Sequence, residues 1–182
     1  MPIPDFNSEG LLPQGFHSCD EASFRQAFVD NFPHMPKRGE IYRGFSQFKT
    51  EMEGHGVSAN KWIDGSYVEN NREPSDVDVL VIIRYDHLNN LSAPAQQHLS
   101  DCFRRGNDSK SRYYIDCYLL PWFPPGHQLR PWFEEKRSYW ADCFGNSCGT
   151  GYQSLIFRIC GPPKGIIEMI IGDPNKSPPV HM

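Results

Sequence analysis

The sequence predicts an α+β fold, in which a small mixed β-sheet is flanked by helices. Two patterns predict it. Apolar residues recur at helical spacing in the first third of the chain, whereas the stretches 79–83 and 165–171 are rich in β-branched residues. The chain has no internal repeat, and its 182 residues, 38% of them hydrophobic, suffice for one domain with its own core.

The predicted domain extends over residues 1–172. Residues 1–17 are expected to lie extended on the surface, because their first part is rich in Pro and Gly, and 173–182 are expected to form a flexible tail. The first helix has Ser18 as its predicted N-cap, since Glu21 follows at the spacing of a capping box. The predicted helices cover about 19–32, 36–54, 92–103 and 130–144.

Strand signals alternate with the later helices, which favours a mixed sheet. A basic loop is expected at 104–111, and the Pro-rich stretch 121–126 ends the strand that follows this loop. The predicted strands are 61–64, 76–84, 112–120, 153–160 and 165–171.

The overall charge limits the kinds of partner. The formal net charge is −4, so the chain lacks the cationic field that holds long nucleic acid nonspecifically. The apolar run Val79–Ile83 is far shorter than the roughly 20 residues that span a bilayer. The first residues lack the basic and apolar regions of a secretory signal. We therefore expect a cytoplasmic protein that does not attach to membranes and whose cysteines are reduced.

Three aspartates are the candidate chemical residues. Alternation places Asp76 and Asp78 on one face of their predicted strand, where like charges repel unless a cation, most simply a hard divalent one, lies between them. An isolated pair of this kind more often lies at a solvated strand end. Asp116 interrupts an otherwise apolar strand, and three converging carboxylates are what two-metal phosphoryl transfer requires. The alternative for Asp116 is an edge strand with a Lys or Arg partner.

A Gly-Ser turn precedes the aspartate pair. Gly65 and Ser66 follow the apolar strand and could present backbone N–H groups and a hydroxyl to phosphate oxygens, although a lone Gly-Ser is usually only a turn. Residues 62–81 combine an apolar strand, Gly-Ser, nine residues and Asp-Val-Asp-Val. This combination resembles the nucleotidyltransferase superfamily of DNA polymerase β, with Asp116 in the place of that family's third carboxylate.

The resemblance implies a minimal nucleotidyltransferase core and a role for each of its residues. Gly65 and Ser66 would bind a nucleoside triphosphate, and Asp76 and Asp78 would ligate two Mg²⁺ or Mn²⁺ ions. Asp116 would hold the catalytic metal and help to deprotonate an acceptor hydroxyl. The implied reaction transfers a nucleoside monophosphate from an NTP or dNTP to a nucleic-acid end, a protein or a nucleotide and releases pyrophosphate. A chain of this length has no room for the fingers and thumb of a templated polymerase.

The whole chain also resembles, more loosely, small stand-alone bacterial members of that superfamily. Several of these are associated with toxin–antitoxin or antiphage defence, which implies a partner protein from the same operon. The antitoxin-type members carry Arg-Gly after the Gly-Ser turn, whereas this chain has Tyr67-Val68 at that position. Their AMP-transfer activity is therefore not expected here.

Basic and aromatic residues near Asp116 are candidates for the nucleotide. Lys110 and Arg112 are expected to meet phosphate oxygens, the alternative being a solvated loop that balances neighbouring acids. Lys164 is a weaker candidate of the same kind. Trp122 could stack on a base, with core packing as its alternative.

Two other functions use the same residues. A metal-dependent phosphodiesterase or nuclease would use the carboxylates to activate water and would need no triphosphate. A catalytically silent nucleotide-binding or interaction module, such as an antitoxin, would bind without turnover.

Overall fold

A computed structural model of the chain describes residues 2–70, 73–103, 108–148 and 160–179. Its helices are α1 (Glu21–Arg25), the π-helix η1 (Gln26–Asp30), α2 (Pro36–Gly54), the 3₁₀-helix η2 (Ser66–Val68), α3 (Tyr85–Asn89), α4 (Ala93–Phe103), α5 (Asp108–Tyr113) and α6 (Arg130–Phe144). Its strands are β1 (Gly15–Ser18), β2 (Ala59–Asp64), β3 (Val77–Arg84), β4 (Ile115–Trp122), β5 (Asn146–Cys148), β6 (Cys160–Pro163) and β7 (Gly165–Ile171). The predicted mixed fold of helices and sheet is confirmed.

The larger sheet has the strand order β1-β7-β2-β3-β4. The β1–β7 and β3–β4 pairs are parallel, and β2 is antiparallel to both of its neighbours. Strands β5 and β6 form a separate antiparallel ribbon. Because β2 runs opposite to β3 and β4, the last residues of β2 meet the first residues of β3 and β4 at one end of the sheet.

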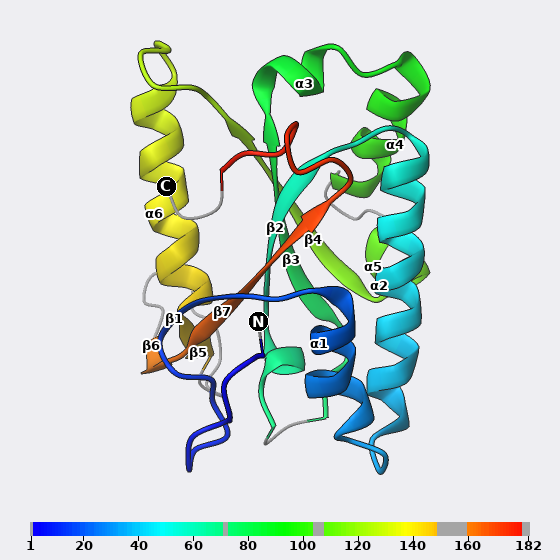
Figure 1. Cartoon of the computed structure of the whole chain (residues 1–182), viewed down its shortest axis with the longest axis vertical. Coiled ribbons are helices and arrows are strands. Elements are labelled where there is room, and N and C mark those ends of the chain that lie inside the picture. The colour runs from blue at the N-terminus through cyan, green and yellow to red at the C-terminus, as the bar shows by residue number, and fades with distance from the viewer. Residues whose placement is uncertain (1, 71–72, 104–107, 149–159, 180–182) are drawn as a thin grey trace.

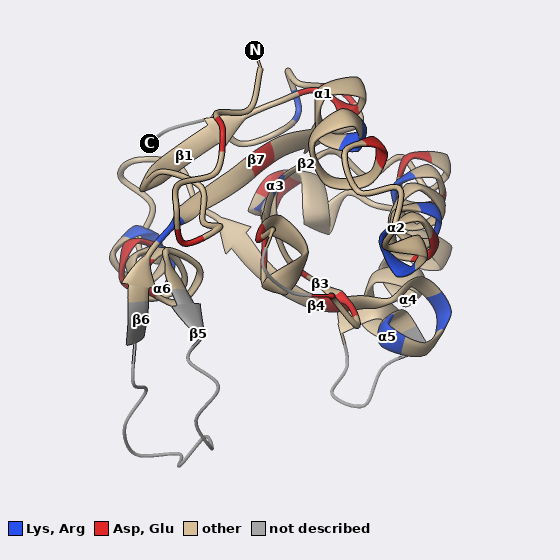
Figure 2. Cartoon of the chain, turned by 90° about the horizontal axis from the view of Figure 1, so that it is seen from below, with Lys and Arg blue, Asp and Glu red and all other residues tan. Residues whose placement is uncertain are grey.

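Each face of the sheet carries its own apolar layer. Helices α1, α2, α4 and α5 lie on one side of the sheet and α6 on the other (Figures 1 and 2). Ile63 and Val79 belong to the layer under α2, whereas Trp62 and Leu80 belong to the layer under α6. This alternation is the ordinary pleat of a strand, so even-numbered positions of β2 and β3 face α6.

The long helices follow the predicted signals. Pro36 occupies the first turn of α2, and the predicted stripe that includes Ile41, Phe45 and Phe48 is buried against the sheet. Ser92 caps α4, because its Oγ accepts from the Ala95 N–H at 3.4 Å. The prediction of α6 is confirmed at both of its ends.

The strand predicted over 112–120 is wrong at its start. Residues 108–113 form α5, and β4 begins only at Ile115. The helix ends at Tyr113, and the next residue, Tyr114, has a left-handed φ of 58° that turns the chain into the strand. Gly or Asn usually marks such a position, so a tyrosine gives no helix-end signal.

Short structured segments lie near both ends of the chain. The cap of α1 is Asp20, whose carboxylate accepts from the Ser23 N–H at 2.7 Å, and not Ser18, which lies in β1 beside β7. The described part of the predicted flexible tail forms a turn at 173–177 that buries Ser177. Most of the strand predicted at 153–160 lies outside the described residues.

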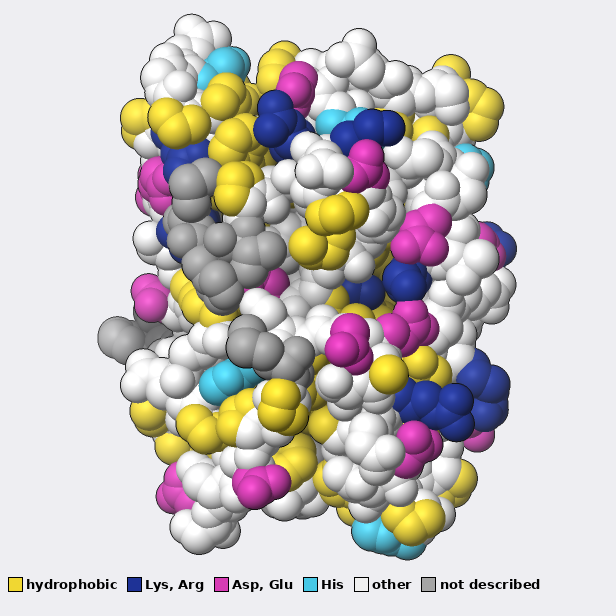
Figure 3. Space-filling model, in the orientation of Figure 1, with side chains coloured by type: hydrophobic (Ala, Val, Ile, Leu, Met, Phe, Trp, Pro, Cys, Tyr) yellow, Lys and Arg dark blue, Asp and Glu magenta, His cyan; other side chains and the backbone are white. Residues whose placement is uncertain are grey.

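Acidic and basic side chains lie close together on the surface of the molecule (Figure 3). On the face drawn in Figure 3, the described acidic and basic side chains are interspersed, and no continuous basic surface covers it. In the part of the chain that the structure describes, no helix combines the length and the apolar character that crossing a membrane requires.

Candidate active site

A row of carboxylates crosses three strands at the end of the sheet where β2 finishes and β3 and β4 start. Asp78 is in register with Asp64 of β2 on one side and with Asp116 of β4 on the other. Residues opposite each other in a sheet share a face, so all three side chains point to the α6 side. The structure thus brings Asp78 and Asp116 together, as predicted, and adds Asp64.

Asp76 lies one residue before β3 and is held by a lysine. Its Oδ2 is 2.5 Å from Nζ of Lys110, whose side chain is 59% exposed while that of Asp76 is 17% exposed. Lys110 also interacts electrostatically with Asp78 and Asp116. Lys110 is therefore at the predicted site, where it serves as the counter-ion of the acids.

Burial and the neighbouring charges both act on the carboxyl group of Asp78. Its pKa is raised to about 6, mainly by burial and further by the negative charges of Asp76 and Asp116, although Lys164 and Lys110 oppose the rise. Asp116 accepts a hydrogen bond from the Tyr118 hydroxyl at 3.0 Å. The end of the sheet is thus a concentration of negative charge centred on Asp78.

The Gly65–Ser66 turn lies directly against this carboxylate. Gly65 has φ 85° and ψ −170°, a region that essentially only glycine adopts. A Cβ at this position would overlap the Asp78 carboxylate. Glycine is therefore required twice, for the backbone conformation and for the approach to Asp78. Ser66 begins the short helix η2 and is partly exposed beside the row.

Arg112 lies elsewhere. Its guanidinium pairs with Glu51 of α2 at 2.8 Å and stacks over the Tyr113 ring. On a helix, positions two apart diverge by about 200°, so α5 directs Lys110 to the carboxylates and Arg112 to α2. The predicted contact of Arg112 with phosphate depended on reading this segment as a loop and strand.

The turn is held by a buried ion cluster of Lys164, Asp64 and Glu69, of which the sequence singles out only Lys164. Lys164, 3% exposed, lies 3.0 Å from Asp64 and 2.9 Å from Glu69. Burial raises the pKa of Asp64 to about 7, and the Lys164 ammonium opposes the rise. The expected contact of Lys164 with phosphate is replaced by this buried ion cluster. Charged residues in strands or loops give no sequence signal of burial, since their partners are distant in the chain.

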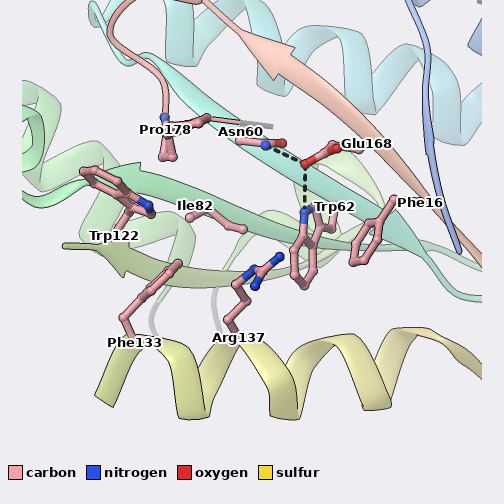
Figure 4. Close-up of a pocket in the computed structure, with 10 residues that line it drawn as sticks. Phe16, Asn60, Trp62, Ile82, Trp122, Phe133, Arg137, Glu168 and Pro178 are labelled. Atoms are coloured by element: carbon pink, nitrogen blue, oxygen red, sulfur yellow. Dashed lines mark hydrogen bonds between the residues drawn. The ribbon is translucent and has the colours of Figure 1, made fainter. Parts of the chain in front are cut away.

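An aromatic cavity lies further along the same face of the sheet. In Figure 4, Asn60 and Trp62 of β2 both donate to the Glu168 carboxylate, at 2.6 and 3.2 Å, beside Trp122 and Pro178. The cavity measures about 20 Å³, which holds one water molecule. Trp122 is 5% exposed, so core packing describes it and base stacking does not.

The carboxylates suit a hard divalent cation in chemistry. Asp76, Asp78 and Asp116 offer only oxygen donors, the type that Mg²⁺ and Mn²⁺ prefer, and their mutual repulsion at Asp78 is what such a cation would relieve. Within the described residues, no three acidic, histidine or cysteine side chains converge as closely as a metal site needs. Asp76 is instead in contact with Lys110, and Asp116 with Tyr118.

The fold and the site define an α/β protein with a five-stranded mixed sheet. One end of this sheet carries the carboxylate row and the glycine turn. By sequence the chain belongs to the family of unknown function DUF6932, whose model matches residues 4–170. No curated protein and no solved structure matches it.

Proposed function

We propose that the protein is a metal-dependent nucleotidyltransferase that moves a nucleoside monophosphate from an NTP or dNTP to a hydroxyl acceptor and releases pyrophosphate. The observation that supports this most is the placing of the Gly65 turn against Asp78, which is itself in register with Asp116. A phosphate-binding turn and a carboxylate row in contact suit a ligand that carries both phosphate and a divalent cation.

Each residue has a part in this proposal. Asp76, Asp78 and Asp116 would hold Mg²⁺ or Mn²⁺, which supplies positive charge to the triphosphate and the attacking oxygen. Gly65 and Ser66 offer the backbone and hydroxyl of a close turn to phosphate oxygens. Lys110, the most exposed member of the group, exchanges its contact with Asp76 for one with phosphate. Asp116 accepts the proton of the acceptor hydroxyl.

The setting of the reaction is proposed from the resemblance of the sequence. We place the enzyme in the cytoplasm, with a non-templated reaction on a nucleic-acid end, a protein or a nucleotide. A role in antiphage defence with a partner protein from the same operon belongs to the same proposal.

A second candidate is a nucleotide-binding module without turnover. The ion pair between Lys110 and Asp76 favours it, because an ammonium already neutralises one of the acids that a catalytic metal needs. In that case triphosphate binds with little dependence on a divalent cation.

The test is label transfer. Purified protein is incubated with each α-³²P-labelled NTP and dNTP in Mg²⁺ or Mn²⁺, alone and with RNA or DNA oligonucleotides, beside the Asp76→Ala variant. We expect label in a polymer, in the protein or in a new nucleotide, and its loss in the variant. Triphosphate binding without any label transfer would replace the transferase by the binding module, and release of product from the oligonucleotides without triphosphate would indicate a nuclease.

A further inference from the structure

Two buried cations hold the backbone that follows the Gly65 turn. Lys164 donates to the Gly65 carbonyl at 3.3 Å and to Glu69 Oε1 at 2.9 Å, and it pairs with Asp64 at 3.0 Å. It therefore connects both ends of the segment 65–69 to the last residue of β2.

Arg38 of α2 holds the same segment from the other side. Its guanidinium is fully buried and donates to the carbonyl of Tyr67 at 2.6 Å and to that of Glu69. The Tyr67 hydroxyl donates back to the Arg38 carbonyl at 3.0 Å. Lys164 and Arg38 are both far from residues 65–69 in the sequence, so only the tertiary fold brings these two cations to the turn.

The cost of such burial points to a role beyond stability. A buried ion cluster is often no more stabilising than apolar side chains of the same volume, because the charges lose their hydration. The cluster around Lys164 does hold the backbone of the turn in one position. It fixes the carbonyl of Gly65, the residue that lies against Asp78, and its charge also acts on Asp78.

We propose that Lys164 is a positioning residue, which keeps the Gly65–Ser66 turn in place against the carboxylate row. The effect of this positioning on ligand binding rests on the proposed function, in which the turn contacts the phosphate groups. Loss of the cluster then releases the turn while Asp76, Asp78 and Asp116 stay in place at the starts of β3 and β4.

The test replaces the whole cluster by neutral side chains. Lys164→Met alone leaves Asp64 and Glu69 buried without their cation and is expected to fold poorly. The triple variant Asp64→Asn/Glu69→Gln/Lys164→Met keeps the volumes and removes all three charges. Its folding is checked by circular dichroism and by its urea midpoint.

Two measurements on the triple variant decide the proposal. Hydrogen exchange at the Val68 and Glu69 amides is expected to accelerate at least tenfold, while exchange in the core of β3 stays unchanged. Asp64 pairs with Lys164 and is not one of the three proposed metal ligands, so the affinity for Mn²⁺ alone is expected to stay within about threefold. The Mn²⁺-dependent affinity for a triphosphate analogue is expected to fall at least tenfold. A purely structural role would weaken both affinities together.

The proposal is overturned if the folded triple variant keeps wild-type exchange rates in the segment 65–69. It is also overturned if the variant binds the triphosphate analogue as tightly as the wild type does. A wild-type protein that binds no triphosphate would refute the proposed function, and the exchange measurement would still decide whether Lys164 positions the turn.

Discussion

Asp78 of β3 and Asp116 of β4 lie opposite each other on adjacent parallel strands and point to the same face of the sheet. Two carboxylates in this relation repel each other, and their repulsion adds to the burial of Asp78 in raising its pKa. The fold maintains this unfavourable pair at the point where the Gly65 turn touches the sheet. Under the proposed function, a bound divalent cation would relieve this repulsion.

The charge of Asp78 is expected to destabilise the fold in a pH-dependent way. Its folded pKa of about 6 exceeds the unfolded value of about 3.9, so the native protein binds more protons than the unfolded chain between these pH values. The penalty is therefore complete above about pH 6 and absent below about pH 4. Asp78→Asn should raise the free energy of unfolding by ~1–2 kcal/mol at pH 8 and by almost nothing at pH 4.

Urea unfolding at both pH values measures this effect, with the exposed Asp101→Asn as the control. If Asp78→Asn raised the free energy of unfolding by the same amount at pH 4 and pH 8, the electrostatic explanation would be contradicted.

Lys110 is expected to compete with a metal ion for Asp76. Lys110→Ala should change the free energy of unfolding by less than ~0.5 kcal/mol, because the lysine is mostly exposed. The same change should tighten Mn²⁺ binding about fivefold, the equivalent of ~1 kcal/mol. Arg112→Ala on the same helix is the matched control, since Arg112 pairs with Glu51. Calorimetric titration should give a higher Mn²⁺ affinity for Lys110→Ala than for Arg112→Ala. Equal affinities of the two variants would show that Lys110 does not compete with Mn²⁺ for Asp76.

Gly65→Ala should disturb the site as well as the fold. The backbone conformation of Gly65 costs other residues about 1–3 kcal/mol, and the new methyl group would force the Asp78 carboxylate to move. Gly56→Ala is the control, because Gly56 also has a positive φ but its Cβ would meet no atom within 4 Å. Both variants should be less stable in urea, and only Gly65→Ala should lose Mn²⁺ binding. Retained binding in Gly65→Ala would remove the turn from the site.

The position of α5 depends on a second glycine. A Cβ on Gly44 of α2 would overlap the backbone of Tyr113, so Gly44→Ala should lower the free energy of unfolding by about 2–3 kcal/mol. Gly39→Ala in the same helix meets only the Arg43 side chain, at 3.9 Å, and should raise it by about 0.5–1 kcal/mol. Thermal or urea unfolding measures whether the two variants change the stability in opposite directions. A destabilising Gly39→Ala would contradict the prediction that this position of α2 has room for a methyl group.

The sequence predicts those parts of the fold whose signals are local. The period of apolar residues in α2 and the β-branched run of β3 identify these elements almost to the residue. By contrast, β2 begins at Ala59, two residues before the predicted start. Asn60 and Lys61 are polar in sequence and yet buried, Asn60 beside Glu168 and Lys61 over the Phe45 ring at 4.1 Å.

The candidate site divides in the same way. Alternation along one strand predicts that Asp76 and Asp78 share a face, and the resemblance to a known motif points to Gly65 and Asp116. In the structure Asp78 lies on β3, whereas Asp76 lies one residue before it. The register that adds Asp64 to the row is a property of strand pairing, which depends on contacts far apart in the chain. The separation of Lys110 from Arg112 depends on a helix only six residues long, which is too short to show a helical period in the sequence.

The most direct test of the central claim, that the carboxylate row and the Gly65 turn form one site for a metal-bound triphosphate, is calorimetric. An α,β-methylene triphosphate is titrated into the wild-type protein and into Asp116→Asn, with and without Mn²⁺. We predict binding by the wild type that requires Mn²⁺ and is lost in the variant. Binding that is indifferent both to Mn²⁺ and to Asp116 would contradict the claim.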